Sequence, residues 1–235
     1  MIDIGLLATI VIVLIVPSVF VRPWPASAAA TGTIDISLGA LFVGLAVGRL
    51  TAVALDDPGS LTNLSDLMII RSGVEFWPGV AAGLTWIAFR ASHDEVAPLR
   101  RLAALTAPAL VAWACYEATC ILRDGCPGPL SSIGLRPDGL VEKMFPIGLV
   151  VAAAAGGAAM VSRRWHQRGM PDVEVVVVAL LSIAIIRSIA SVWLPHIGNE
   201  LTRQHRTSIA VGIVAVIAFV VIRRRLPRRA LSRDP

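Results

Sequence analysis

Charged side chains are scarce in this chain of 235 residues: only 16% are Asp, Glu, Lys or Arg, whereas 56% are hydrophobic. Soluble domains carry about 25% charged residues, so this chain has too few to cover a globular surface. Lysine is nearly absent, because Lys143 stands alone and every other basic residue is Arg. The composition excludes a soluble enzyme and a disordered tail.

Cysteine is also rare, with three residues in the chain. The positions of Cys115, Cys120 and Cys126 match neither a metal-binding spacing nor a redox motif, and so few thiols exclude a disulfide-rich secreted domain. Cys120 and Cys126 either pair in an oxidising compartment or remain free thiols, and the sequence leaves both open. The net charge of +5 comes from Arg residues clustered between apolar runs, which favours membrane topology over a nucleic acid partner.

Long hydrophobic runs are what the chain does contain, and several approach the ~20 residues of a transmembrane helix. They lack the polar alternation of a barrel strand, and only helices satisfy the backbone of such runs in lipid. We therefore predict an all-α integral membrane protein with one polytopic domain over residues 1–235. The seven predicted spans are 4–21, 36–55, 74–89, 102–122, 144–161, 173–194 and 207–222.

The first span has an alternative interpretation, because the small residues of 26–30 resemble a signal-peptide cleavage site. A signal peptide begins with a positively charged region, and no basic residue precedes Arg22. We therefore expect a retained helix. In the third span, Pro78 predicts a kink or a re-entrant segment.

The distribution of basic residues predicts the orientation, because cytoplasmic loops carry an excess of Lys and Arg. With the N-terminus outside, the cytoplasmic stretches hold more basic residues than the outer loops do. The cytoplasmic set comprises Arg22, Arg90, Arg100, Arg101, Arg163, Arg164, Arg168 and the Arg residues of 223–233. Seven spans with an outer N-terminus and an inner C-terminus follow.

Three ionisable residues, Arg49, Glu117 and Arg187, lie inside predicted spans, where each costs roughly 2.5–3.5 kcal/mol at the helix centre. All three lie at a similar depth in the outer half, and Glu75 and Glu142 can reach the same layer. One interpretation is snorkelling or structural pairing between helices. The other is a polar cavity near the outer leaflet, in which Arg binds the phosphate of a lipid headgroup.

Several motifs resemble the bacterial prolipoprotein diacylglyceryl transferase family, and they follow the family's order over about residues 38–225. Gly48-Arg49-Leu50 resembles a GRL-type helix. The segment 73–79, Gly-Val-Glu-Phe-Trp-Pro-Gly, resembles the family's G-x-S-F-H-G-G. Further similar stretches are Ala107-Pro108-Ala109-Leu110, Asp124-Gly125-Cys126, 137–142, Arg187 with the residues after it, and Leu201-Thr202 with Ser208.

The resemblance implies a reaction at the outer face of the bacterial cytoplasmic membrane. The family moves diacylglyceryl from phosphatidylglycerol to the lipobox Cys thiol of a preprolipoprotein, without a metal or organic cofactor. Such chemistry needs a base, because thiolate is the nucleophile, and cations that hold the departing phosphate. The substrate-binding residues that the resemblance implies here are Arg49, Gly73, Gly79, Gly125, Glu142, Arg187 and Ser208.

Two important family positions are substituted. Trp77 stands where the family has His and cannot accept a proton, and Glu117 or Ala118 stands where it has a signature Arg. Loss of a general base costs about 10²–10⁴-fold in rate. The candidate catalytic residues that remain are Arg187, Glu75, Glu117 and His205. Two functions therefore stay open: a transferase of this type, or an inactive relative that binds phospholipid or a membrane-protein partner.

Overall fold

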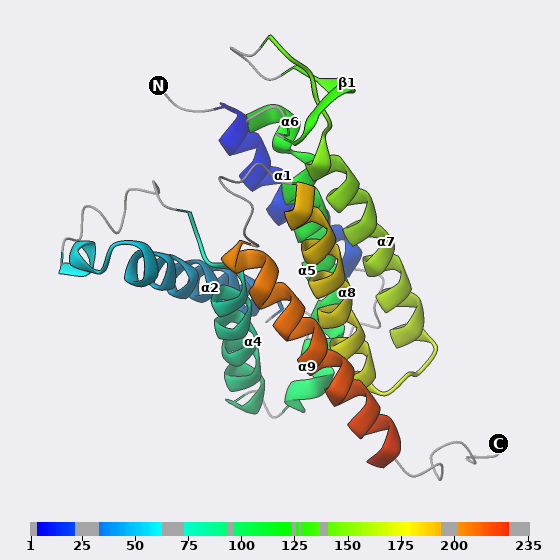
Figure 1. The fold of residues 1–235 in the computed structure, drawn as a ribbon. Coiled ribbons are helices and arrows are strands. Elements are labelled where there is room, and N and C mark those ends of the chain that lie inside the picture. The colour runs from blue at the N-terminus through cyan, green and yellow to red at the C-terminus, as the bar shows by residue number, and fades with distance from the viewer. Residues whose placement is uncertain are drawn as a thin grey trace.

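The computed structural model describes residues 4–21, 33–62, 73–93, 96–123, 126, 128–136, 141–193 and 202–225. Helices dominate this part of the chain (Figure 1). The long ones are α1 (Ile4–Val21), α2 (Thr33–Asp56), α4 (Phe76–His93), α5 (Pro98–Ala118), α7 (Ile147–Gln167), α8 (Asp172–Trp193) and α9 (Arg203–Arg225). The short elements are η2 (Pro58–Thr62), α6 (Cys120–Arg123) and β1 (Leu130–Leu135).

The all-α membrane class is confirmed. Within the described ranges, five helices are long and apolar enough to cross a membrane: α2, α5 continued through α6, α7, α8 and α9. Many large apolar side chains on these helices point outward, among them Phe42, Ile185 and Ile217, as expected where lipid is the solvent. The chain is therefore a multi-pass membrane protein.

Each predicted span overlaps one long helix, but the boundaries differ. The third helix begins at Phe76 and continues to His93, and the second begins three residues earlier than expected, at Thr33. Pro78 lies in the first turn of α4, where its missing N–H leaves no intrahelical bond unmade. Pro78 therefore does not interrupt the helix.

Helix α5 is central, because it contacts α1, α4, α7 and α8. A small core forms where α5, α7 and α8 meet, from Leu110, Val111, Ala159 and Ala179. The other close pairs are α2 with α4 and α8 with α9. Figure 1 shows α2 and α4 on one side of the molecule, with α9 crossing in front of the α5–α8 group.

Glycines bring the backbones of α2 and α4 together. A Cβ atom at Gly44 would lie 2.9 Å from the carbonyl oxygen of Gly79, and one at Gly79 would lie 2.8 Å from that of Gly44. One turn along α2, the carbonyl oxygen of Gly48 accepts a hydrogen bond of 3.0 Å from the N–H of Glu75. Small residues permit such close packing in membranes, and here the packing fixes the segment that leads into α4.

The loop between α6 and α7 contains a strand that the sequence analysis did not predict. Strand β1 makes antiparallel bridges from Leu130 and Leu135 to Met144. Figure 1 shows β1 and α6 at the same end of the molecule as the start of α1, with the C-terminal end of α9 at the opposite end. The described part of this loop therefore lies at the end of the molecule where α6 ends and α7 begins.

Candidate functional site

A cavity of about 260 Å³ lies among α5, α6, α7, α8 and α9. Its polar lining comprises Glu117, Arg123, Arg187, Ser191, Gln204 and Ser208. The volume is near the lower bound of roughly 300 Å³ for small-molecule sites, which suits a compact polar group. Three of the predicted site residues, Glu117, Arg187 and Ser208, therefore lie around one cavity.

Arg187 projects from α8 into this cavity. Its guanidinium carbon lies 3.9 Å from the centre of the Phe76 ring, and its Nη2 donates to Oε1 of Gln204 at 3.2 Å. The carboxylates of Glu117 and Glu75 attract it electrostatically. A guanidinium carries five N–H donors, and within the described residues Gln204 accepts the only hydrogen bond that Arg187 makes. The remaining donors suit an anionic ligand.

Glu117 is the carboxylate of the lining. Its Oε1 accepts a hydrogen bond of 3.0 Å from Nε1 of Trp113, one helical turn before it on α5. The resemblance places the signature Arg of the transferase family at either Glu117 or Ala118 of this chain. A negative charge therefore lies in the cavity beside Arg187, and it can stabilise the guanidinium or take a proton.

Trp77, which the resemblance aligns with a His of the transferase family, contacts Ser208. Its Nε1 donates to Ser208 Oγ at 2.9 Å, and Ser208, which is only 1% exposed, donates in turn to the carbonyl oxygen of Gln204 at 2.7 Å. The indole thus ties the start of α4 to α9. It serves as a hydrogen-bond donor at this position and supplies no base.

Replacing Trp77 with Phe should lower the free energy of unfolding by about 0.5–1.5 kcal/mol more than replacing Trp86 does, the value of one hydrogen bond. Trp86 is a matched control, because its buried Nε1 has no partner within the described residues. Both substitutions remove similar ring volume, but replacing Trp86 also removes an unpaired buried donor. The value of the bond to Ser208 is therefore a lower bound on the difference between the two variants. The measurement is the unfolding midpoint in mixed detergent micelles. Equal losses for the two variants would contradict the assignment.

Glu75 is held by an arginine to which the sequence analysis assigned no role. The buried carboxylate accepts a 2.7 Å hydrogen bond from Nε of Arg203, whose Nη2 also pairs with Asp56 Oδ1 at 2.8 Å. To act as a base, Glu75 would have to break this ion pair. No local signal reveals the pairing, since Arg203 and Glu75 are 128 residues apart.

His205, another candidate catalytic residue, is not in the cavity lining but contacts a lining serine. Its Nδ1 lies 2.7 Å from the Oγ of Ser191, a lining residue. Ser191 donates its one hydroxyl hydrogen to the carbonyl oxygen of Ser188 at 2.9 Å, so Nδ1 of His205 is the donor toward Ser191. Glu117, which lines the cavity, is therefore better placed than Glu75 or His205 to take a proton from a ligand.

The remaining predicted binding residues lie elsewhere. Arg49 is not part of the cavity lining, and its Nη1 donates to the carbonyl oxygen of Gly73 at 3.0 Å. Gly73 has a positive φ of 75°, and Gly79 packs against α2. Glu142 is exposed in the loop before α7, and Gly125 lies outside the described residues. Their roles in binding stay predictions.

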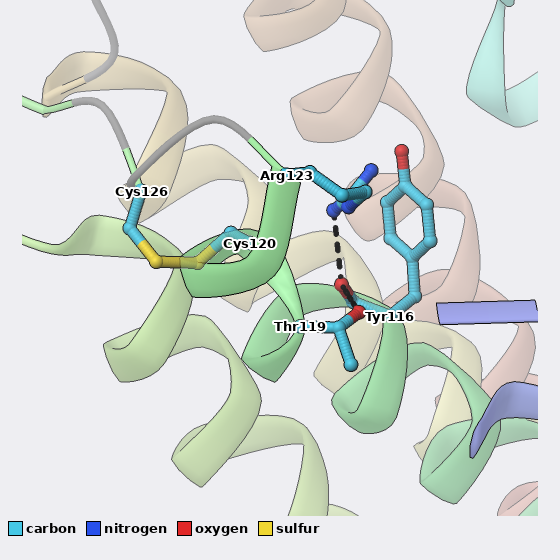
Figure 2. The surroundings of a disulfide bond; sticks show 5 residues. All are labelled: Tyr116, Thr119, Cys120, Arg123 and Cys126. Carbon is cyan, nitrogen blue, oxygen red and sulfur yellow. Dashed lines mark hydrogen bonds between the residues drawn. A yellow bond between two sulfur atoms is a disulfide. The ribbon is translucent and has the colours of Figure 1, made fainter. Parts of the chain in front are cut away.

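The question of cysteine pairing is answered by the structure. Cys120 and Cys126 form a disulfide, and both are buried in the cavity wall (Figure 2). Cys115 is a free thiol. Across the described part of the chain, His, Cys, Asp and Glu do not gather into a group of three that could hold a metal ion.

A comparison with protein-family models gave no match, and a comparison with curated proteins gave none either. The resemblance to the transferase family therefore rests on the sequence motifs alone.

Proposed function

We propose that this chain is a prolipoprotein diacylglyceryl transferase-like protein of the bacterial cytoplasmic membrane, which handles phosphatidylglycerol at the outer face. The observation that carries the proposal is the polar cavity among α5, α7, α8 and α9, with the Arg187 guanidinium in its wall. A lipid phosphate is the most abundant anion at the depth of the membrane interface. Arg binds phosphate oxygens through a planar, permanently charged fork.

The proposal requires a topology of seven spans with the N-terminus on the outer side of the membrane. The Cys120–Cys126 disulfide supports it, because disulfides persist on the oxidising side of a membrane. The start of α1 lies at that same end, whereas the beginning of α5 and the ends of α7 and α9 lie at the other (Figure 1). Those distant ends carry Arg100, Arg163, Arg164 and Arg224, as the positive-inside rule requires.

In the proposed reaction, the lipobox thiol gives its proton to a base, and its sulfur attacks the glyceryl carbon that is bonded to the phosphate oxygen. A C–S bond forms, the C–O bond breaks, and glycerol phosphate leaves with the electron pair. Arg187 stabilises the negative charge on the departing phosphate. Glu117 is the base that the geometry favours, because it lines the cavity. Glu75 is paired with Arg203, and His205 lies outside the lining with its Nδ1 directed at Ser191.

A second candidate function is an inactive relative that binds phospholipid or a membrane-protein partner. Two observations favour it. Trp77 stands in place of the family's His and donates its N–H to Ser208. Glu75 forms a hydrogen-bonded ion pair with Arg203. Binding by Arg187 needs neither residue as a base, so a headgroup site persists in the absence of the transfer reaction.

One experiment separates these functions. The purified chain is placed in nanodiscs of phosphatidylglycerol and phosphatidylcholine, with a lipobox peptide added, and lipid retention and peptide mass are both measured by mass spectrometry. A diacylglyceryl-modified peptide supports the transferase, and retained phosphatidylglycerol with unmodified peptide supports the inactive relative. Arg187→Gln should weaken retention about 10- to 100-fold, as expected for one charge-assisted contact. Arg100→Gln, at the exposed start of α5, is the control. Unmodified peptide together with equal retention in all variants would exclude both the transferase and the phospholipid-binding relative.

A further inference from the structure

A second guanidinium belongs to the same cavity. Arg123, the last residue of α6, lines it together with Arg187. Arg123 was not among the site residues predicted from the sequence. Its position is one to two helical turns beyond the site where the resembling family has its signature Arg, which is Glu117 or Ala118 in this chain.

The surroundings of Arg123 leave part of its guanidinium group available to a ligand. Its Nη2 donates to the carbonyl oxygen of Tyr116 at 3.1 Å, and its guanidinium carbon lies 4.2 Å from the centre of the Tyr116 ring. The buried Nε has no hydrogen-bond acceptor among the residues that the structure describes. Because Nε is enclosed, a ligand in the cavity meets Nη1 instead, which makes no hydrogen bond among the described residues.

The charges of the lining indicate what kind of anion fits. Among the described lining residues, Arg123 and Arg187 are cationic and Glu117 is anionic, which leaves an excess of one positive charge. A phosphodiester carries one negative charge and neutralises this excess. A phosphate monoester carries about −1.5 to −2 near pH 7, so it is left with uncompensated charge beside Glu117.

We propose that Arg123 and Arg187 together bind the single phosphodiester of an intact phospholipid, and that the Cys120–Cys126 disulfide positions Arg123 in this site. The proposal rests on the proposed function, because it concerns the same cavity. It adds a second phosphate contact, a preference for diester over monoester, and a dependence of lipid binding on the disulfide.

The role of the disulfide follows from its place in the chain. Cys120 begins α6 and Arg123 ends it, one helical turn away. The disulfide joins Cys120 to Cys126, so the segment that carries Arg123 is closed into a short loop (Figure 2). Figure 2 also shows the guanidinium beside the Tyr116 ring, with Thr119 sharing the same carbonyl oxygen. Reduction releases one end of this loop and lets Arg123 leave the cavity wall.

The first test compares phosphatidylglycerol retention in nanodiscs for Arg123→Gln, Arg123→Lys and the wild type. Arg123→Gln should retain about 10- to 100-fold less lipid, and Arg123→Lys should recover part of the loss by restoring the charge. Arg136→Gln is the matched control, because Arg136 follows β1, is exposed and is not part of the lining. Size-exclusion chromatography confirms that each variant is folded.

The outcomes distinguish this proposal from the proposed function. If Arg187→Gln loses lipid and Arg123→Gln does not, the second contact is refuted and the proposed function stands. If neither loses lipid, the proposed function itself fails. Glycerol 3-phosphate added in solution should compete poorly, and competition as strong as that of added phosphatidylglycerol would overturn the preference for a diester.

The second test addresses the disulfide. Treatment of the wild type with a phosphine reductant should lower retention by a factor similar to that of Arg123→Gln. The double variant Cys120→Ser/Cys126→Ser should be weak from the start and insensitive to reductant. Cys115→Ser, which removes the free thiol, should respond to reductant like the wild type. Undiminished retention after verified reduction would refute the positioning role of the disulfide.

Discussion

Replacing Gly48 with Ala should destabilise the protein by about 1–3 kcal/mol, the range for overpacking a close contact. A Cβ at this position would lie 2.6 Å from the carbonyl oxygen of Glu75 and 2.6 Å from Cγ1 of Val74. The first of these is a backbone atom, and the N–H of the same residue is hydrogen-bonded to the Gly48 carbonyl. The segment before α4 cannot withdraw without breaking that bond.

The matched control for Gly48→Ala is Gly156→Ala on α7, where an added Cβ meets nothing within 4 Å. Ala is favoured over Gly in helices by about 1 kcal/mol, so the control should be neutral or stabilising. The measurement is the midpoint of unfolding in mixed detergent micelles. Similar midpoints for the two variants would show that α2 and α4 do not pack as closely as the structure indicates.

The helices could be predicted from the sequence because their cause is local. A run of about twenty apolar residues must satisfy its own backbone in lipid, so each predicted span overlaps a long helix in the structure. The pairing of helices depends instead on which faces meet. The sequences around Gly44 and Gly79 contain no pattern that predicts their contact. The bridges from β1 to Met144 were missed for a different reason, because they join loop residues that show no hydrophobic periodicity.

The candidate site was predictable in part for a similar reason. The position of a residue along its span gives its depth, and depth placed Glu117 and Arg187 in one layer. Depth does not predict which face of the helix a side chain occupies. Arg49 lies at a depth similar to that of Glu117 and Arg187, yet its guanidinium donates to the carbonyl oxygen of Gly73. Arg123 and Arg203 could not be predicted as site residues, because their contacts arise only in the tertiary structure.

Removing Arg203 should cost about 2–3 kcal/mol, because the loss of one partner leaves a buried carboxylate uncompensated, with some relief from the solvent exposure of Arg203. The Glu75 side chain is 9% exposed and the Arg203 side chain 42%. The expected result for Arg203→Met is thus a larger loss of stability than for Asp56→Asn. Asp56 pairs with the same guanidinium, but its side chain is 41% exposed, and exposed pairs contribute about 0–1 kcal/mol.

A double-mutant cycle with Glu75→Gln then shows whether Glu75 is a structural partner or a base. If the main role of Glu75 is to pair with Arg203, the double variant Arg203→Met/Glu75→Gln should be more stable than Arg203→Met alone. The second substitution removes the buried, unpaired carboxylate that the first leaves behind. Phosphatidylglycerol retention by Glu75→Gln should then match the wild type, since Arg187 and Arg123 remain in the cavity. Additive losses in the cycle would refute the pairing. A Glu75→Gln variant of native stability whose peptide modification is abolished would instead make Glu75 the base.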